Sequence, residues 1–196
     1  MDLEQVARES GLVRPEHVTK LLRSLKDSNF GWIVCSPSET EERLQGDLFA
    51  QMPVALIDAT GRVRSKNFTV MVINNVCDLQ RGRSEFVTLA PVEDFERFAA
   101  AMLNKDPLRA RPLLENIRAN RIDEFFYLPN CSVLPQGGIV RFDLLSSLSA
   151  TFYENAIASG RRLASLTQDG FYFLLMKLTH FLARPESPDV MREKQP

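Results

Sequence analysis

Apolar residues recur at helical spacing in three parts of the chain. Near the start they predict two short helices within residues 3–26, divided by Gly11 and Pro15, which suit a helix end and a helix start. From Phe95 onward the same spacing predicts a helix, and a second one is expected at 113–120. These two form a helical insertion at about 93–121. The last predicted helix covers 168–182.

Short apolar runs of strand length occupy the rest of the chain. They fall at residues 48–49, 54–57, 70–73, 86–89, 125–128 and 139–142, with turn residues between them. The run 70–73 is continuous and rich in β-branched residues, which predicts a strand buried on both faces. The pattern therefore favours the α+β class, with a small antiparallel β-barrel at its centre.

This pattern divides the chain into three parts. Residues 1–36 are expected to form an N-terminal helical hairpin, followed by a polar linker. Residues 44–184 are expected to form the barrel, with the helical insertion and the C-terminal helix. Residues 185–196 carry prolines and charges and are expected to be a flexible tail.

The charges are nearly balanced. The chain has 24 Lys and Arg residues against 25 Asp and Glu residues, for a net charge of −1 over 196 residues. No global field therefore attracts nucleic acid or an anionic membrane, so such a partner would need a local basic patch. Three widely spaced cysteines and the lack of a long apolar run favour a cytoplasmic protein with no membrane contact.

Common cofactor and metal motifs are missing from the sequence. It has no phosphate-binding glycine loop with Lys-Ser or Lys-Thr, no Gly-x-Gly-x-x-Gly after a strand and no His-Glu-x-x-His. The two histidines, His17 and His180, are not near a cysteine at zinc-binding spacing. We therefore expect no cofactor and no metal site.

Polar residues follow the predicted central strand and form the candidate binding set. Its members are Asn74, Asn75, Cys77, Asp78, Arg81 and Arg83. The Cys77 thiol lies beside loop arginines and could therefore be reactive. The favoured alternative is that Cys77 is a small buried apolar residue and that Asp78 caps the turn. The two asparagines could bind a ligand or, as favoured, form an Asx turn.

Basic residues flank both ends of the same strand. Arg62, Arg64 and Lys66 precede it, and Arg81 and Arg83 follow it. Such residues on a barrel rim could bind an RNA backbone, although exposed loop arginines also serve only solubility.

The N-terminal helices offer a different function. Lys20, Arg23 and Lys26 on the second predicted helix are typical of a helix-turn-helix DNA-binding element. The third helix of that motif is missing, because residues 31–35 have the pattern of a strand. DNA is therefore the least favoured partner.

Three segments, at residues 46–49, 70–75 and 87–92, together resemble the strand order of PemK/MazF-like proteins, the toxins of toxin-antitoxin pairs. The resemblance implies an SH3-like barrel. It also implies an acid-base role for Arg64, with Lys66 as a substitute. Asp78 is a further catalytic candidate if the chain is a ribonuclease. The family's ribonucleases carry a hydroxyl residue after a proline-containing turn, but Val92-Glu93-Asp94 follows Pro91 here.

That departure decides the functional expectation. The chain is expected to be a non-catalytic binding or accessory module of a bacterial toxin-antitoxin or phage-defence system, acting on a protein partner. The alternatives are a MazF-like endoribonuclease that cleaves single-stranded RNA and a helix-turn-helix DNA-binding regulator. A homodimer also remains open.

Overall fold

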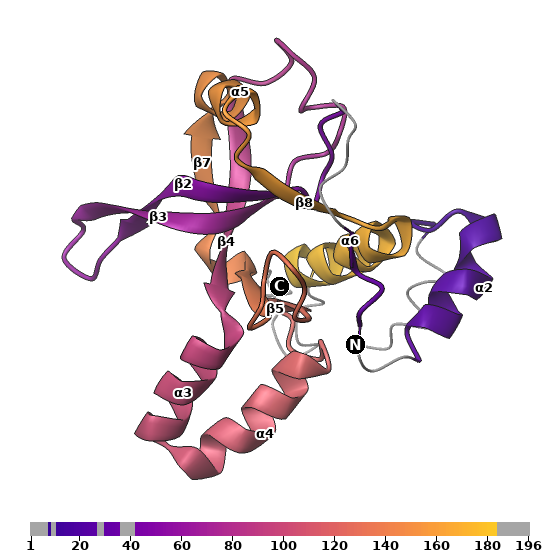
Figure 1. Ribbon diagram of the computed structural model, residues 1–196, viewed down its shortest axis with the longest axis vertical. Coiled ribbons are helices and arrows are strands. Elements are labelled where there is room, and N and C mark those ends of the chain that lie inside the picture. The colour runs from indigo at the N-terminus through magenta and orange to yellow at the C-terminus, as the bar shows by residue number, and fades with distance from the viewer. Residues whose placement is uncertain (1–7, 9–10, 27–29, 36–41, 184–196) are drawn as a thin grey trace, which may run out of the picture.

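The strands form one curled antiparallel sheet with helices packed around it (Figure 1). The computed structural model describes residues 8, 11–26, 30–35 and 42–183. The strands are β1 (Val34–Cys35), β2 (Leu48–Ile57), β3 (Val63–Val72), β4 (Phe86–Asp94), β5 (Phe125–Leu128), β6 (Gly138–Arg141), β7 (Ser146–Ser149) and β8 (Arg162–Leu166). The helices are α2 (Pro15–Ser24), α3 (Phe95–Lys105), α4 (Pro107–Arg118), α5 (Ala150–Ala158) and α6 (Gln168–Leu182), with a short 3₁₀ helix at Phe142–Leu144.

The sheet bends into a half-barrel. Its order is β1-β8-β2-β3-β4-β6-β5, and β7 pairs with the first half of β4 on the edge that β6 leaves open. The bend brings β7 against β2, where the Ala55 N–H donates to Ser146 Oγ at 3.2 Å. A register shift in β2 between Phe49 and Met52, with Gln51 at φ 53°, supplies a local bulge that increases the curl. The α+β class is confirmed, and the expected barrel is a half-barrel.

The end of β3 is buried on both faces, as its sequence predicts. Val70 and Val72 pack into one apolar cluster with Tyr153 of α5. Met71 and Ile73 point to the opposite face and join the cluster that holds α2 and α6. Since successive residues of a strand face opposite sides, this short segment supports both layers of the molecule.

Pro91 lies inside β4 and not in a turn, which corrects the expectation drawn from the resemblance. It stands opposite Val70, while the Ile73 N–H donates to the Thr88 carbonyl at 3.0 Å. Bonded and non-bonded pairs alternate along an antiparallel ladder, so position 91 needs no N–H toward β3. The other edge of β4 pairs with β7 up to Leu89 and with β6 from Val92 onward. Pro91 lies between these two pairings.

The helical insertion consists of α3 and α4 and lies within the predicted bounds, but its second helix is longer than predicted. The α3 helix begins after Asp94, whose carboxylate accepts the Arg97 N–H at 2.8 Å as an N-cap. The α4 helix begins at Pro107 and not near residue 113, because a proline at the first helical position needs no N–H partner. Pro112 lies inside α4 and cannot bond the carbonyl of Leu108, a residue at the exposed tip of the hairpin.

The remaining expectations have mixed outcomes. The predicted bounds of α6 are confirmed, and α2 confirms the second N-terminal helix. The first predicted helix, the linker and the tail lie mainly or wholly outside the described residues. The strand expected at 31–35 is reduced to β1, and β7, α5 and β8 were not predicted.

The start of α6 is anchored to the segment before β1. Thr167 caps the helix by accepting the Gly170 N–H at 3.0 Å, and its hydroxyl donates to the Trp32 carbonyl at 2.6 Å. Gly170 lies so close to Ile33 that a Cβ added there would be 2.3 Å from the Ile33 carbonyl oxygen. Only glycine allows this approach of the two main chains.

Lys177 of α6 is a buried cation. It is 0% exposed, and its Nζ donates to the carbonyls of Asn120 at 3.0 Å and Ile122 at 2.5 Å. Burial lowers the pKa of the Lys177 ammonium to about 8, although Asp123 and Glu124 partly oppose this change. The side chain thereby fixes α6 to the turn between α4 and β5.

We expect the free energy of unfolding to rise from pH 8 to pH 10.5. The folded pKa of Lys177 is lower than the unfolded value of about 10.4, so the unfolded chain binds more protons in this window. The gain is on the order of 1–3 kcal/mol, measured by urea denaturation at each pH. It should disappear in Lys177→Met and persist in Lys105→Met, which alters an exposed lysine of α3. Equal pH dependence in wild type and Lys177→Met would contradict this role.

Candidate functional site

The asparagines at the end of β3 shape the loop that follows. Asn74 Oδ1 accepts the Thr88 N–H, and Asn75 Oδ1 accepts the Cys77 N–H at 3.1 Å. The Asx-turn prediction is therefore confirmed for Asn75. The amide oxygens of both side chains are engaged, which leaves their Nδ2 groups for contact with a ligand.

Cys77 and Asp78 differ from the favoured prediction. Cys77 is exposed and not a buried apolar residue, because the turn directs it outward from the sheet. Asn75, and not Asp78, caps the turn. Asp78 instead lines a cavity of about 440 Å³ between this loop and α5.

The cavity joins segments that are far apart in the chain. Asp78 and Arg81 line it from the loop, and Tyr153 and Glu154 line it from α5. The Glu154 carboxylate binds two arginines, Arg43 at 2.5 Å and Arg81 at 3.4 Å. A second cavity of about 450 Å³ adjoins the first at Leu79 and Gln80 and includes Arg43. We call Arg43, Asp78, Arg81 and Glu154 the loop cluster.

A buried ion pair lies behind the loop cluster. Asp47 is 1% exposed, and its carboxylate accepts from Arg162 at 2.9 Å and from the Ser165 hydroxyl at 2.7 Å. Burial raises the pKa of Asp47, and the bonds from Ser165, the Leu44 N–H and Arg162 oppose that rise. The pair connects the start of β2 to β8.

Tyr153 lies between the ion pair and the cavity. Its ring packs on Phe49 at 5.2 Å, and its hydroxyl is buried with no hydrogen-bond partner among the described residues. Burial raises the pKa of the Tyr153 phenol, and the nearby Asp47 charge adds to the effect. The hydroxyl is therefore a neutral donor at physiological pH.

The structure does not bring the catalytic candidates together. Arg64 and Lys66 lie near the start of β3, whereas Asp78 follows its end, and the ten-residue strand is about 30 Å long. Arg64 Nε pairs with Asp58 at 3.2 Å, and the Lys66 ammonium lies 5.1 Å from the centre of the Phe68 ring. The two basic groups of the sequence therefore form two separate surfaces, with Arg83 exposed on the distant loop.

A groove of about 450 Å³ lies between β3 and α3. Lys66, Phe68 and Thr69 line it from β3, and Asp94 and Arg97 line it from the start of α3. Thr69 stands directly opposite Val92. The structure therefore places a hydroxyl beside the position where the resemblance requires one, and this hydroxyl comes from a different strand.

The loop cluster has the chemistry of an ion-binding site. Its arginines and carboxylates neutralise one another, so an anionic group could replace Glu154 at Arg43 or Arg81. Across the described residues, no group of three or more His, Cys, Asp and Glu side chains has metal-binding geometry. His180 pairs with Asp123 at 3.4 Å, and His17 contacts Tyr172, so neither histidine joins this cluster.

Sequence reasoning missed most members of this cluster. Arg43 and Glu154 belong to segments with no motif, and only the three-dimensional fold brings this ion pair to the loop that holds Asp78. Gly46-Asp47 was noted as a strand start, and a buried partner for that carboxylate could have been sought among the arginines.

No protein-family model matches the chain, and no curated protein shows significant sequence similarity to it. The PemK/MazF-like resemblance therefore stays a prediction. Within the part of the chain that the structure describes, every helix is too short or too polar to cross a bilayer.

We expect Asp47→Ala to destabilise the fold by about 3–5 kcal/mol, because it leaves the Arg162 charge with one partner fewer at a buried site. Urea denaturation would measure the loss. The double variant Asp47→Ala/Arg162→Ala should lose less than the sum of the two single changes.

Glu96→Ala is the matched control, since it breaks the exposed pair with Arg118 and should cost less than about 1 kcal/mol. Additive losses at Asp47 and Arg162 would show that the pair contributes no coupling.

Proposed function

We propose that the chain is a non-catalytic protein-binding module that contacts its partner through the β2–β3 hairpin. One observation carries this proposal. Ile57 and Val63 pair directly across the two strands at the end of the hairpin, and they are 74% and 68% exposed. Figure 1 shows this hairpin projecting from the body of the molecule.

The two faces of the hairpin differ in charge. Arg64 and Lys66 share one face, because residues two apart on a strand point the same way. The other face presents the Ile57–Val63 pair and then Ala55 opposite Ser65, with no charged side chain. An apolar face of a β-sheet is normally buried against another part of the protein. Because this face of the hairpin is exposed, it suits contact with another protein.

The charges around the pair indicate the partner's chemistry. Arg62, Arg64 and Lys66 belong to the opposite face of the same hairpin, and Asp58 is the one acidic side chain of the turn. A partner that covers the apolar face and reaches the other face with acidic side chains would be complementary to the hairpin.

The separation of the catalytic candidates supports a non-catalytic role. General acid-base chemistry requires groups within hydrogen-bond reach of one substrate, and Arg64 and Asp78 lie at opposite ends of β3. The half-barrel supports a relation to the SH3-like barrels of PemK/MazF-like proteins. With that relation, the module belongs to a toxin-antitoxin or phage-defence system.

The test uses the full chain and one defined partner. The chain is purified from its own host, the co-purifying protein is identified and prepared separately, and the affinity is measured by calorimetry. Ile57→Lys/Val63→Lys should weaken binding at least about tenfold, because it places charges in the desolvated centre of the contact. Unchanged far-ultraviolet circular dichroism would show that folding is retained.

Leu108→Lys is the control, since Leu108 is 86% exposed at the α3–α4 hairpin and lies outside the proposed surface. Equal affinity of the hairpin variant and the wild type would reject this surface. A chain that co-purifies with no protein would reject the proposed function.

RNA is the second candidate, because the groove between β3 and α3 combines Lys66 with the aromatic Phe68 and the Thr69 hydroxyl. Aromatic and basic side chains together suit single-stranded nucleic acid. We expect purified protein to leave single-stranded RNA intact over hours on a denaturing gel. Cleavage that Arg64→Ala or Lys66→Ala abolishes without loss of folding would establish the ribonuclease instead.

Duplex DNA is the remaining alternative. Lys20 of α2 is paired with Asp169 at 3.2 Å, which reduces the charge that this helix offers to a phosphate backbone. Binding to duplex DNA that falls steeply with salt would favour the regulator over the protein-binding module.

A further inference from the structure

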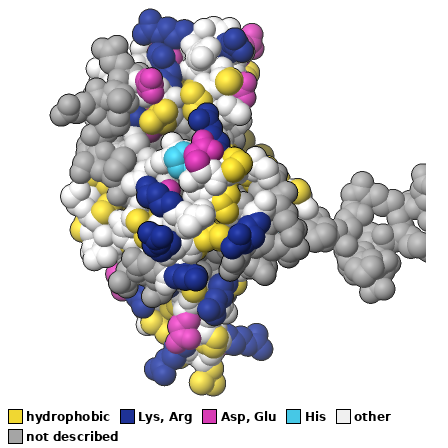
Figure 2. All heavy atoms as spheres, turned by 90° about the vertical axis from the view of Figure 1, so that its right-hand side faces the viewer, with side chains coloured by type: hydrophobic (Ala, Val, Ile, Leu, Met, Phe, Trp, Pro, Cys, Tyr) yellow, Lys and Arg dark blue, Asp and Glu magenta, His cyan; other side chains and the backbone are white. Residues whose placement is uncertain are grey.

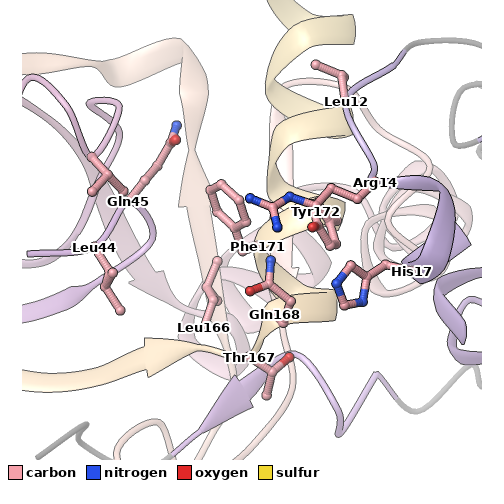
Figure 3. A pocket seen from close by; sticks show the side chains of 11 residues that line it. Leu12, Arg14, His17, Leu44, Gln45, Leu166, Thr167, Gln168, Phe171 and Tyr172 are labelled. Carbon is pink, nitrogen blue, oxygen red and sulfur yellow. The ribbon is translucent and has the colours of Figure 1, made fainter. Parts of the chain in front are cut away.

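A cavity of about 460 Å³ lies on a different side of the molecule from the β2–β3 hairpin, between α2 and the start of α6 (Figure 3). This volume is within the range of small-molecule sites. Arg14 and His17 form the α2 wall, and Gln168, Phe171 and Tyr172 form the α6 wall. Leu44 and Gln45, which precede β2, close the opposite side.

The charged groups of the lining have one sign. Arg14 is the charged side chain among the described lining residues, and no described Asp or Glu lines the cavity. Figure 3 shows the Arg14 guanidinium directed across the cavity toward Phe171. No described residue supplies a carboxylate to Arg14 within ion-pair distance. The guanidinium is therefore available to a bound anion.

The surrounding surface strengthens this preference. Arg14, Arg23 and Lys26 are exposed on α2 and its flanks, where Glu16 is the acidic residue and Lys20 is paired with Asp169. Figure 2 shows that Lys and Arg side chains gather on the side of the molecule where α2 lies. Clustered positive charge raises the local concentration of anions near the cavity.

The rest of the lining suits a planar ring. The ring of Tyr172 lies 5.7 Å from that of Phe171 and 5.4 Å from that of His17. Tyr172 is only 5% exposed, and its hydroxyl makes no hydrogen bond to another described residue. In Figure 3 the Gln168 and Tyr172 side chains come from α6 and the Arg14 and His17 side chains from the start of α2, and all four line the same cavity. Aromatic surfaces beside amide and hydroxyl groups can both stack on a nucleobase and hydrogen-bond to its edge.

We infer that this cavity binds a mononucleotide, with the phosphate at Arg14 and His17 and the base against Phe171 and Tyr172. The phosphate accepts from the guanidinium and from an imidazole N–H. The Gln168 amide and the Tyr172 hydroxyl are further polar groups of the same lining. A bound mononucleotide would bridge α2 and α6. This site is separate from the surface proposed for the protein partner.

The test is calorimetric titration of the full chain with AMP, GMP, CMP and UMP. We expect saturable one-to-one binding of at least one of them. The matching nucleoside and inorganic phosphate should each bind at least about tenfold more weakly, because each retains only one of the two contacts. Arg14→Gln should weaken nucleotide binding about ten- to a hundredfold, and Tyr172→Phe should weaken it less.

Arg23→Gln is the matched control, since it removes an exposed charge from the same helix outside the cavity. Its affinity should stay within about twofold of the wild type. Arg14 makes no side-chain cap bond at the start of α2, so both variants should fold, as equal melting temperatures would show. No saturable binding of any of the four nucleotides, or equal losses in Arg14→Gln and Arg23→Gln, would overturn the inference.

Discussion

Burial of Val70–Ile73 on both faces of the sheet is the constraint on which the rest of the structure depends. Two of these side chains belong to the core beneath α5, and two belong to the core beneath α2 and α6. A strand between two apolar layers excludes charge along its length. Polar groups can therefore lie only before the segment, after it or at its neighbouring edges.

This constraint explains why the polar surfaces are separated. The basic residues before the segment lie on the hairpin, and the polar residues after it lie on the loop beside α5. The buried polar side chains near the strand are hydrogen-bonded: Asp47 accepts from Arg162, Ser165 and the Leu44 N–H, and the Gln45 amide donates to the Ile73 carbonyl at 2.8 Å. The polar surfaces of the described residues are thus distinct, and Arg64, Lys66 and Asp78 do not meet in one of them.

The elements that sequence analysis predicted best are those with a strong local pattern. The α6 helix has apolar residues on almost every turn, and 70–73 is an unbroken apolar run rich in β-branched residues. The start of α4 was missed because Pro112, an internal proline, usually marks a helix break and so hides the helix that begins at Pro107. The β7 strand, Ser146–Ser149, has one apolar residue, so its pairing with β4 comes from the tertiary structure and not from propensity.

The candidate sites were less predictable for a related reason. Local sequence indicated that Asn74 to Arg83 is a polar loop, but the side chains facing it come from residues 43 and 154. It also could not show that the turn leaves Cys77 outside the core. The cavity at Arg14 depends on the packing of α2 against α6, two elements separated by more than a hundred residues.

The main-chain contact between Gly170 and Ile33 has a consequence for sequence drift. The carbonyl of residue 33 is present whatever its side chain, so that position can exchange one aliphatic residue for another of similar volume. Position 170 has no such freedom, because any β-carbon would push the start of α6 away from the Ile33 main chain. The two partners of a single contact should therefore evolve at very different rates.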